Sequence, residues 1–459
     1  MQEVVTKNDQ IEITIEDIGS EGEGIGKYEG YTLFVKDTVM GDRALVQVMK
    51  TGKTYGYAKL LKLITPSEYR CEPKCPIASK CGGCQLQHVT YSKQLEYKEN
   101  KVRNCLTRIG GFDSFKMEPI VGMEEPYYYR NKSQFPVGKD KDGNLEIGFY
   151  ASRTHSIIDT DQCCIGAEIN DEIIAFMRYF IEKYKIETYE EESHRGLLRH
   201  ILIRVGFATD EVMVCLVING TELPHQEELI QGLQKIKGMT SICLNVNKYR
   251  TNVILGEKII PLWGADYITD SIGEIKYRIS PLSFYQVNPV QTKKLYDTVL
   301  EYADLHGDEV VWDLYCGIGT ISLFLAKNAK KVYGVEIVAA AVEDAKTNAQ
   351  INDITNAEFF VGAAEEVLPG IFKKENSQAD IIVVDPPRKG CDQSLLDTIL
   401  EISPKKVVYV SCDPATLARD LKYLCEKGYQ LEKVKSVDQF CHSTHVETVV
   451  LLQRANTEN

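Results

Sequence analysis

The order of hydrophobic and polar positions divides the 459-residue chain into parts with different patterns. Up to about residue 65, short runs alternate apolar and polar positions and are rich in Thr, Tyr, Val and Gly, which predicts a small antiparallel β-barrel. From about 123 to 265 the pattern is mixed. Runs such as LLRHILIRVGF and VMVCLVING predict strands, and AEINDEIIAFMRYFIEKYK predicts a helix. We therefore expect an α+β domain in the middle of the chain.

From about residue 285 the pattern changes to apolar strands that alternate with amphipathic helices. The apolar runs are continuous, as in a parallel sheet covered on both faces. The last two runs, EKVKSVDQF and HVETVVLLQ, have no helix between them and predict an antiparallel pair at the sheet end. A doubly wound sheet with a terminal hairpin indicates a Rossmann-like methyltransferase domain. Between barrel and middle domain, residues 91–111 predict one amphipathic helix that ends at glycine.

Charge is distributed unevenly along a chain whose formal net charge is −13. Residues 70–108 contain eight Lys or Arg and three acids, and residues 193–206 contain three arginines, two histidines and no acid. Because a polyanion responds to local charge, these segments are compatible with an RNA-binding face, and Arg199 and Arg204 are our candidates for RNA contacts. A solvated surface explains the same charges. We find no membrane-length apolar stretch and no signal-peptide core, so we expect a cytoplasmic protein.

A nucleotide-like ligand is indicated by DLYCGIGT, which places Asp313, Gly317 and Gly319 at the first strand-to-helix turn of the parallel sheet. Glycines let backbone approach a ligand, and the helix start favours negative charge. Glu336 ends the next strand, where an acid can accept both ribose hydroxyls. The motif lacks the Gly-x-Gly-x-x-Gly spacing of dinucleotide sites, so we rank S-adenosylmethionine ahead of a nicotinamide cofactor.

The motif VVDPPRKG puts Asp385 at the carboxyl edge of the sheet, where open α/β folds bind ligands. Enzymes that methylate exocyclic amines usually carry an aromatic residue after Pro-Pro, whereas this chain has Arg388. The departure speaks against amine methylation and leaves carbon methylation open.

Cys412 ends the strand of VVYVSCDPATLARD, and Asp413 and Pro414 suit the start of the following helix. A helix N-terminus favours thiolate, so we expect a lowered pKa and a nucleophilic role for Cys412. Other cysteines are expected to be buried and inert: Cys105, Cys215, Cys243, Cys316 and Cys425.

A nucleophile at this position suits the chemistry of pyrimidine C5, which takes a methyl group only after a thiolate has added at C6. The C5 proton must then be removed by a base. Glu447, at the start of the last strand, is the first candidate for that base, and His442 and His445 are its competitors.

Together, the motifs SFYQVN, DLYCGIGT, VDPPRKG, SCDPATLARD and HVET resemble the RNA (uracil-5-)-methyltransferases, close to the TRAM-domain enzymes of 23S ribosomal RNA. The resemblance implies Cys412 as nucleophile and Glu447 as base, with Phe284 near the target base. It also implies four residues around S-adenosylmethionine: Gln286, Tyr315, Glu336 and Asp385.

The same resemblance implies a domain organisation. Residues 1–65 would form the TRAM β-barrel, an OB-like RNA-binding fold. Residues 66–90 and 123–265 would form a central iron–sulfur and RNA-binding domain, and residues 91–122 and 266–459 the methyltransferase domain.

The segment CEPKCPIASKCGGCQLQH contains Cys71, Cys75, Cys81 and Cys84. Four neighbouring thiols suit zinc or an iron–sulfur cluster, and the composition does not choose between them. The resemblance implies a [4Fe-4S] cluster held by Cys75, Cys81, Cys84 and, from the distant DTDQCCIG, Cys163 or its neighbour Cys164. Alignment favours Cys163 and leaves Cys71 spare; zinc or a plain reduced loop is the alternative.

The function expected from these features is methylation of uridine C5 in 23S ribosomal RNA. A transfer-RNA enzyme with the same chemistry is the rival within the class, and we rank it lower because of the barrel and the cysteine segment. An RNA-binding or folding factor without turnover is the rival outside the class, and the intact Cys412, Glu447 and Asp385 argue against it.

Overall fold

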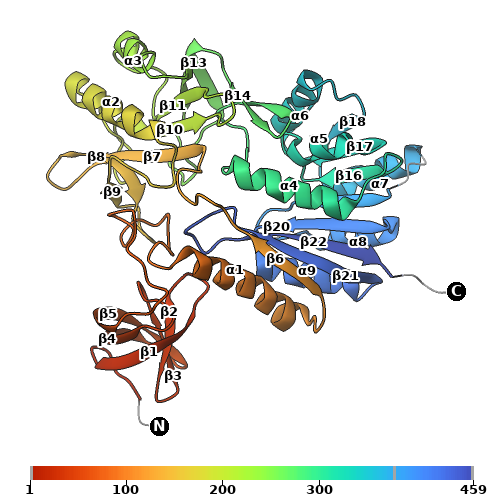
Figure 1. Cartoon of the computed structure of the whole chain (residues 1–459). Helices are drawn as coiled ribbons and strands as arrows, with labels where there is room; N and C mark the ends of the chain where they lie inside the picture. The colour runs from red at the N-terminus through yellow and green to blue at the C-terminus, as the bar shows by residue number, and fades with distance from the viewer. Residues whose placement is uncertain (1–3, 376–378, 456–459) are drawn as a thin grey trace. The chain divides into compact units, whose positions relative to one another are not determined.

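The computed structural model describes residues 4–375 and 379–455, which form two compact units (Figure 1). Of these residues, the first unit contains those up to Lys101 together with Ala151–His155 and Phe440–His445, and the second unit contains the others. Across the described residues, no helix is long and apolar enough to cross a membrane.

The first unit is built around a closed five-stranded barrel with the strand order β1-β2-β3-β5-β4. The strands are β1 (Gln10–Ile18), β2 (Gly24–Tyr28), β3 (Tyr31–Val35), β4 (Arg43–Thr51) and β5 (Tyr55–Thr65). Alternate residues such as Ile13 and Ile15 or Leu33 and Val35 fill the barrel interior, because successive side chains of a strand point to opposite faces. The predicted barrel is confirmed.

Residues 91–110 form a continuous helical segment, as predicted. It consists of α1 (Tyr91–Cys105) and the π-helical turn η1 (Leu106–Gly110). Gly111 ends it in the left-handed conformation, with a φ of 73°, and its N–H binds the carbonyls of the preceding turn.

The second unit contains a seven-stranded sheet with the order β13-β12-β11-β10-β7-β8-β9. The strands are β7 (Lys132–Lys139), β8 (Leu145–Tyr150), β9 (Ile157–Asp159), β10 (Leu198–Val205), β11 (Val212–Ile218), β12 (Met239–Val246) and β13 (Lys258–Gly264). Two helices accompany it in Figure 1: α2 (Ile169–Tyr184) and α3 (Gln226–Leu233). The buried stripe of α2, which includes Ile173, Met177 and Phe180, has the spacing that the sequence pattern predicts.

The same unit contains an eight-stranded sheet with the order β18-β17-β16-β19-β20-β22-β21-β6. Its strands are β6 (Lys116–Val121), β16 (Val310–Leu314), β17 (Lys331–Glu336), β18 (Ala357–Val361), β19 (Ile381–Val384), β20 (Lys406–Ser411), β21 (Tyr429–Val437) and β22 (Glu447–Arg454). The five strands from the edge strand β18 to β20 run parallel, and β22 is antiparallel to both β20 and β21, as predicted. The sequence pattern did not reveal that β6 lies outside β21 and closes this side of the sheet.

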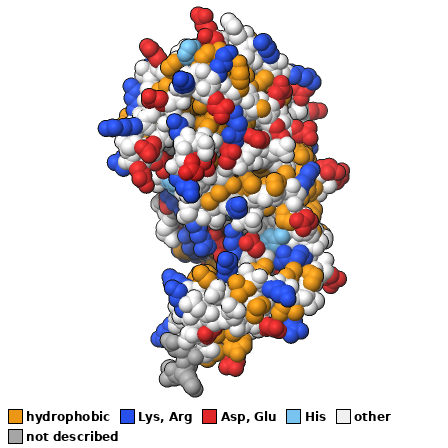
Figure 2. Space-filling model, turned by 90° about the vertical axis from the view of Figure 1, so that its left-hand side faces the viewer, with side chains coloured by type: hydrophobic (Ala, Val, Ile, Leu, Met, Phe, Trp, Pro, Cys, Tyr) orange, Lys and Arg blue, Asp and Glu red, His pale blue; other side chains and the backbone are white. Residues whose placement is uncertain are grey.

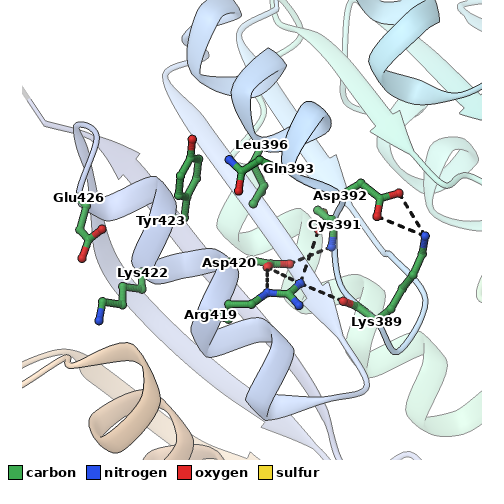
Figure 3. A pocket seen from close by; sticks show the side chains of 10 residues that line it. All are labelled: Lys389, Cys391, Asp392, Gln393, Leu396, Arg419, Asp420, Lys422, Tyr423 and Glu426. Atoms are coloured by element: carbon green, nitrogen blue, oxygen red, sulfur yellow. Dashed lines mark hydrogen bonds and ion pairs between the residues drawn. The ribbon is translucent and has the colours of Figure 1, made fainter.

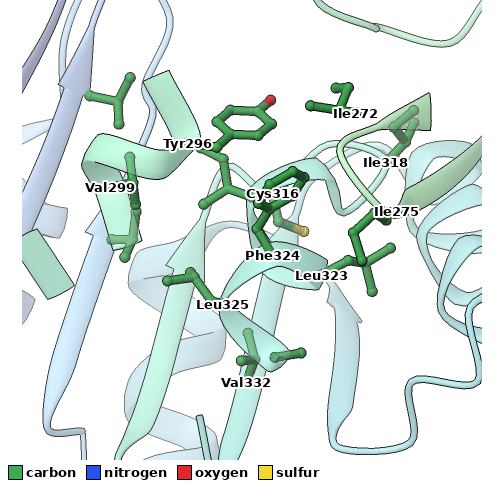
Figure 4. Packing of buried hydrophobic residues seen from close by; sticks show 14 of the residues in the cluster. Ile272, Ile275, Tyr296, Val299, Cys316, Ile318, Leu323, Phe324, Leu325 and Val332 are labelled. Atoms are coloured by element: carbon green, nitrogen blue, oxygen red, sulfur yellow. The ribbon is translucent and has the colours of Figure 1, made fainter. Parts of the chain in front are cut away.

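Helices cover both faces of this sheet, as Figure 1 shows. They are α4 (Pro289–Ala303), α5 (Thr320–Ala326), α6 (Ala339–Ile351), α7 (Ala364–Glu375), α8 (Gln393–Ile402) and α9 (Pro414–Cys425). A short hairpin, β14 (Ile268–Ile272) and β15 (Ile275–Ile279), packs on α4, α5 and α6. In Figure 4, Tyr296 and Val299 of α4 meet Phe324 of α5 and Ile275 of the hairpin in one buried cluster. This packing fixes the turn between β16 and α5, where a ligand loop was expected.

Candidate active site

The glycine loop after β16 and the end of β17 form the first part of the site. Glu336 accepts hydrogen bonds from the backbone N–H groups of Gly317 (3.2 Å) and Val338 (2.9 Å), one at each carboxylate oxygen. The carboxylate is partly exposed, and each oxygen keeps a lone pair for a further donor. The structure therefore holds Glu336 in an orientation that suits a pair of ligand hydroxyls.

Left-handed backbone shapes the loop itself. Tyr315 has a φ of 67° and Gly317 a φ of 55°, and no atom lies within 4 Å of the position that a Cβ on Gly317 would take. Gly319 is different, because a Cβ there would come within 3.2 Å of Phe359 and Ala345. Gly317 thus leaves the backbone open to a ligand, whereas Gly319 allows α5 to approach the sheet.

Gln286 lies in the loop between β15 and α4 and is mostly buried. Its backbone carbonyl accepts from the side chain of Asn131 (3.0 Å), and its side-chain oxygen lies 3.5 Å from the amide nitrogen of Gln439. Asn288 caps α4 and donates to the carbonyl of Gln439 (3.1 Å). Gln439 therefore organises this loop, and no motif in the sequence identified it. Phe284, two residues before Gln286, is 68% exposed.

The predicted RNA contacts Arg199 and Arg204 are corrected by the structure, because β10 is buried along almost its whole length. Arg199 donates to the carbonyls of Asn247 (2.8 Å) and Tyr249 (2.9 Å). Arg204 is 3% exposed and donates to the carbonyls of Pro281 (3.3 Å) and Ser283 (2.5 Å). Both arginines hold loops of this unit and do not reach solvent.

Cys412 and Glu447 meet at the carboxyl edge of the sheet. β20 and β22 are antiparallel, with Ser411 paired to Thr448, so the next position in this register sets Cys412 opposite Glu447. Glu447 is 4% exposed and Cys412 is partly exposed. Asp413 caps α9 by accepting from the N–H groups of residues 415 and 416, as the sequence predicted.

Acidic groups dominate the electrostatics around the thiol. Burial and the carboxylates of Glu447 and Asp385 raise the pKa of Cys412 to about 12, against a smaller lowering by Arg388. Burial and Asp385 likewise raise the pKa of Glu447, and burial raises that of Asp385. The predicted lowering of the Cys412 pKa is wrong, because burial and two carboxyl groups outweigh the helix N-terminus. Because its pKa is raised, the Glu447 carboxylate binds a proton more strongly than an ordinary glutamate does.

A hydrogen-bond network ties the loop after β19 to α9 (Figure 3). Asp420, fully buried on α9, accepts from the backbone N–H of Cys391 (2.8 Å) and the hydroxyl of Tyr409 (2.7 Å). Arg419 donates to the carbonyl of Lys389 (2.9 Å), and Thr416 to that of Arg388 (3.0 Å). The helix that begins behind Cys412 therefore also positions the loop that carries Arg388.

A cavity of about 570 Å³ lies beside this network and is lined from the loop, α8 and α9. None of the predicted catalytic or cofactor residues lines it. The cavity is therefore separate from the candidate active site.

His442 and His445, the competitors for the role of base, belong to the first unit rather than to the unit of Cys412 and Glu447. Nδ1 of His442 lies 3.2 Å from the side-chain nitrogen of Gln94 on α1, and its ring is buried. This contact suits a structural role for His442.

The cysteine segment also lies in the first unit, whereas Cys163 and Cys164 lie in the second. Cys71, predicted to be spare, donates its S–H to the carbonyl of Gln87 (3.4 Å). Within residues 4–375 and 379–455, no group of three or more His, Cys, Asp or Glu side chains is arranged to hold a metal ion. The fold thus gives the [4Fe-4S] cluster no support, and the cluster stays a prediction from the sequence. Of the cysteines expected to be inert, Cys215, Cys243 and Cys316 are buried, while Cys105 and Cys425 are partly exposed.

A comparison with protein families decides the class. The family model described as tRNA (Uracil-5-)-methyltransferase matches residues 90–455. This chain belongs to that family. A TRAM-domain model matches residues 4–61, which agrees with the barrel. The chain is an RNA methyltransferase, and the predicted fold class is confirmed.

Individual relatives agree with this assignment. A protein of Clostridium tetani named as an uncharacterized RNA methyltransferase is 51% identical over 449 residues, which cover 98% of this chain and 97% of the relative. A protein of Bacillus cereus with the same name is 51% identical over 451 residues, with 98% of each chain covered. A solved structure of Pyrococcus abyssi tRNA (uracil-54, C5)-methyltransferase in complex with S-adenosyl-L-homocysteine is 31% identical. It matches with a TM-score of 0.78 over 96% of this chain and 100% of its own.

Proposed function

We propose that this RNA methyltransferase transfers the methyl group of S-adenosylmethionine to C5 of a uridine in 23S ribosomal RNA. The observation that carries the chemistry is the position of Cys412 opposite Glu447, with Asp385 acting on both. C5 methylation requires a nucleophile and a base close together, and the adjacent strands β20 and β22 bring candidates for both to one place.

In the proposed reaction, the thiol of Cys412 releases its proton to solvent, and the resulting thiolate forms a bond to C6 of the uracil. The C5–C6 electron pair moves toward the C4 carbonyl, and C5 becomes nucleophilic. C5 would then take the electrophilic methyl group of S-adenosylmethionine, whose sulfur–methyl bond breaks to leave S-adenosylhomocysteine. Glu447 then removes the C5 proton, the C5–C6 double bond re-forms, and the thiolate of Cys412 leaves. The raised pKa of Glu447 favours this proton removal, and Arg388 favours the thiolate.

The cofactor would be bound by the elements described above. The carboxylate of Glu336, held by two backbone N–H groups, would accept the ribose hydroxyls, and the open backbone at Gly317 would lie against the ligand. Tyr315, Gln286 and Asp385 would complete its surroundings. The side-chain amide of Gln286 can both donate and accept hydrogen bonds, which suits the zwitterionic amino-acid group of the cofactor.

Transfer RNA is the alternative substrate, and one observation favours it. The P. abyssi enzyme is named as a transfer-RNA methyltransferase, and its structure matches 96% of this chain. The unmatched part is shorter than the TRAM domain at residues 4–61, so the match includes part of the barrel. The presence of a barrel therefore does not favour ribosomal RNA over transfer RNA as the substrate. The preference for ribosomal RNA rests on the resemblance and the cysteine segment alone.

Tritium release tests the proposed activity. RNA transcribed with uridine labelled at C5 should release tritium to water when the protein and S-adenosylmethionine are added, because methylation displaces the C5 hydrogen. Parallel reactions with labelled transcripts of ribosomal and of transfer RNA identify the substrate. Methylation of the labelled RNA without tritium release contradicts C5 methylation, and release from transfer RNA alone contradicts the ribosomal assignment.

The [4Fe-4S] cluster is a separate part of the proposal and rests on the spacing of Cys75, Cys81 and Cys84. Protein purified without oxygen should contain about four irons per chain. The variant Cys81→Ser should lose the metal, whereas Cys71→Ser should keep it. Stoichiometric zinc, or iron loss in both variants alike, contradicts the assignment. No catalytic step depends on this cluster.

A further inference from the structure

Three cationic side chains converge where the seven-stranded sheet meets the loop before α4. Lys132 begins β7, and Arg204 is its directly paired neighbour on β10. Paired residues of antiparallel strands point to the same face, so Lys132 and Arg204 lie side by side. Arg130, two residues earlier, donates through Nε to the carbonyl of Lys132 (3.2 Å). We call these three residues the Lys132 cluster.

No acidic side chain balances the Lys132 cluster among the described residues. The charges that act on Lys132 are Arg204 from β10 and Arg130 from its own segment, and together with burial they lower the pKa of Lys132 to about 8. Arg204 is bound only to carbonyl oxygens, and within the described part of the chain its buried Nε–H has no hydrogen-bond partner. Partial burial of positive charge without a counter-ion costs free energy, and a bound anion would offset that cost.

The Lys132 cluster is joined to the loop that carries Phe284 and Gln286. Arg204 donates a hydrogen bond to the carbonyl of Ser283, the residue before Phe284. Asn131, between Arg130 and Lys132 in sequence, donates to the carbonyls of Gln286 (3.0 Å) and Val287 (2.9 Å). Lys132 and Arg130 remain partly exposed. An anion bound here would therefore lie beside the loop whose exposed aromatic ring was expected near the target base.

We propose that the Lys132 cluster binds a phosphodiester group of the RNA next to the target uridine, with Lys132 and Arg130 as the contacting residues and Arg204 as the positioning residue. This inference rests on the proposed function. A phosphodiester keeps its negative charge at every pH near neutrality and accepts several hydrogen bonds, which matches the ammonium of Lys132 and the free guanidinium donors of Arg130. The carboxylate of S-adenosylmethionine is the competing anion.

Salt dependence of binding tests the site without any turnover. The probe is a single-stranded dodecamer of uridylate, titrated at several salt concentrations in the absence of S-adenosylmethionine. Lys132→Met should reduce the slope of log affinity against log salt by about 0.7, the value for one lost phosphate contact on a single strand. Lys132→Arg should retain the slope. Lys139→Met is the matched control, since Lys139 is an exposed residue at the other end of β7, and it should leave the slope unchanged.

Neutral phosphates locate the contact. A set of dodecamers, each with one methylphosphonate, should contain a position that weakens binding to the unaltered protein but has no further effect on Lys132→Met. An unchanged salt slope in a folded Lys132→Met protein overturns the proposal. A loss of S-adenosylmethionine affinity in that variant, with unchanged binding of the dodecamer, assigns the cluster to the cofactor carboxylate and overturns it as well. These experiments measure binding and need no methylation. If the protein methylates no RNA, the proposed function is rejected, but the binding results still test the Lys132 cluster.

Discussion

Cys412 and Glu447 stand opposite each other where β20 ends and β22 begins, and the carboxyl group raises the pKa of the thiol. Their proximity therefore opposes formation of the Cys412 thiolate. In the proposed reaction, the same proximity would place the base beside C5, the neighbour of the carbon that the thiol would attack. The two effects have separate experimental consequences.

Replacement of each residue should stop turnover at a different step. Cys412→Ala removes the bond to C6, so no covalent protein–RNA species should form. Glu447→Gln leaves addition and methyl transfer possible but blocks loss of the C5 proton, so a methylated adduct should accumulate and survive denaturing electrophoresis. The base assignment is contradicted if Glu447→Gln turns over normally while a His442 or His445 variant traps the adduct.

The reactivity of the Cys412 thiol should respond in opposite directions to its two charged neighbours. At about pH 9, Glu447→Gln should accelerate alkylation of Cys412 by iodoacetamide, because an anion that raises the pKa is gone. Arg388→Met should slow it, because the charge that lowers the pKa is gone. A change of one pKa unit corresponds to about tenfold in thiolate fraction below the pKa. Mass spectrometry of the peptide that contains Cys412 measures the rate, and equal shifts in both variants would contradict the geometry.

Glu336→Ala should weaken S-adenosylmethionine binding by roughly 1.5–3 kcal/mol, since a charged acceptor for hydroxyl donors is lost. Isothermal calorimetry measures the affinity. Glu343→Ala, an exposed change on α6, is the control and should bind normally. Unchanged affinity in Glu336→Ala would remove this residue from the cofactor site.

Asp420→Ala should lower the free energy of unfolding by about 3 kcal/mol, because the buried N–H of Cys391 and the hydroxyl of Tyr409 lose their acceptor. Asp297→Ala breaks an exposed pair with Lys293 on α4 and should change it by less than about 1 kcal/mol. Urea denaturation compares the two variants. Equal effects would mean that the network around α9 contributes no more than a surface contact.

Lys132 predicts a pH dependence of stability. Its folded-state pKa is lowered to about 8, whereas an unfolded lysine has a pKa near 10.4, so between these values the unfolded chain binds more protons. The free energy of unfolding should therefore rise with pH through this window, by about 1.4 kcal/mol for each unit by which the pKa is lowered. Lys132→Met lacks this contribution. The free energy of unfolding of the unaltered protein minus that of Lys132→Met should therefore increase from pH 7 to pH 10. A constant difference would contradict the lowered pKa.

Sequence reasoning succeeded where local pattern determines structure. Alternation revealed the barrel, continuous apolar runs revealed the parallel strands, and Asp413 with Pro414 marked the start of α9. It failed where distant segments meet. The buried partners of Arg204 are carbonyls in a loop far along the chain, so a basic strand resembled an RNA-binding surface.

The pKa of Cys412 was misjudged for a related reason. A helix N-terminus is visible in the sequence, whereas the burial of the thiol and its distance from Glu447 and Asp385 depend on the order of strands in the sheet. Gln439 and β6 were missed because neither carries a motif, and each gains its role only from what lies beside it.

The position of β22 inside the sheet has a consequence for synthesis of the chain. β22 follows all the other strands in sequence, yet it separates β20 from β21, and β21 in turn holds β6, the first strand of the sheet to be made. A growing polypeptide therefore carries β6 without its neighbour until β21 has been translated, and such long-range pairing is slow. Because Glu447 is the first residue of β22, an unfinished chain can present the thiol but not the opposing carboxyl group. Until β22 has joined the sheet, a growing chain would therefore lack the base that the proposed reaction requires.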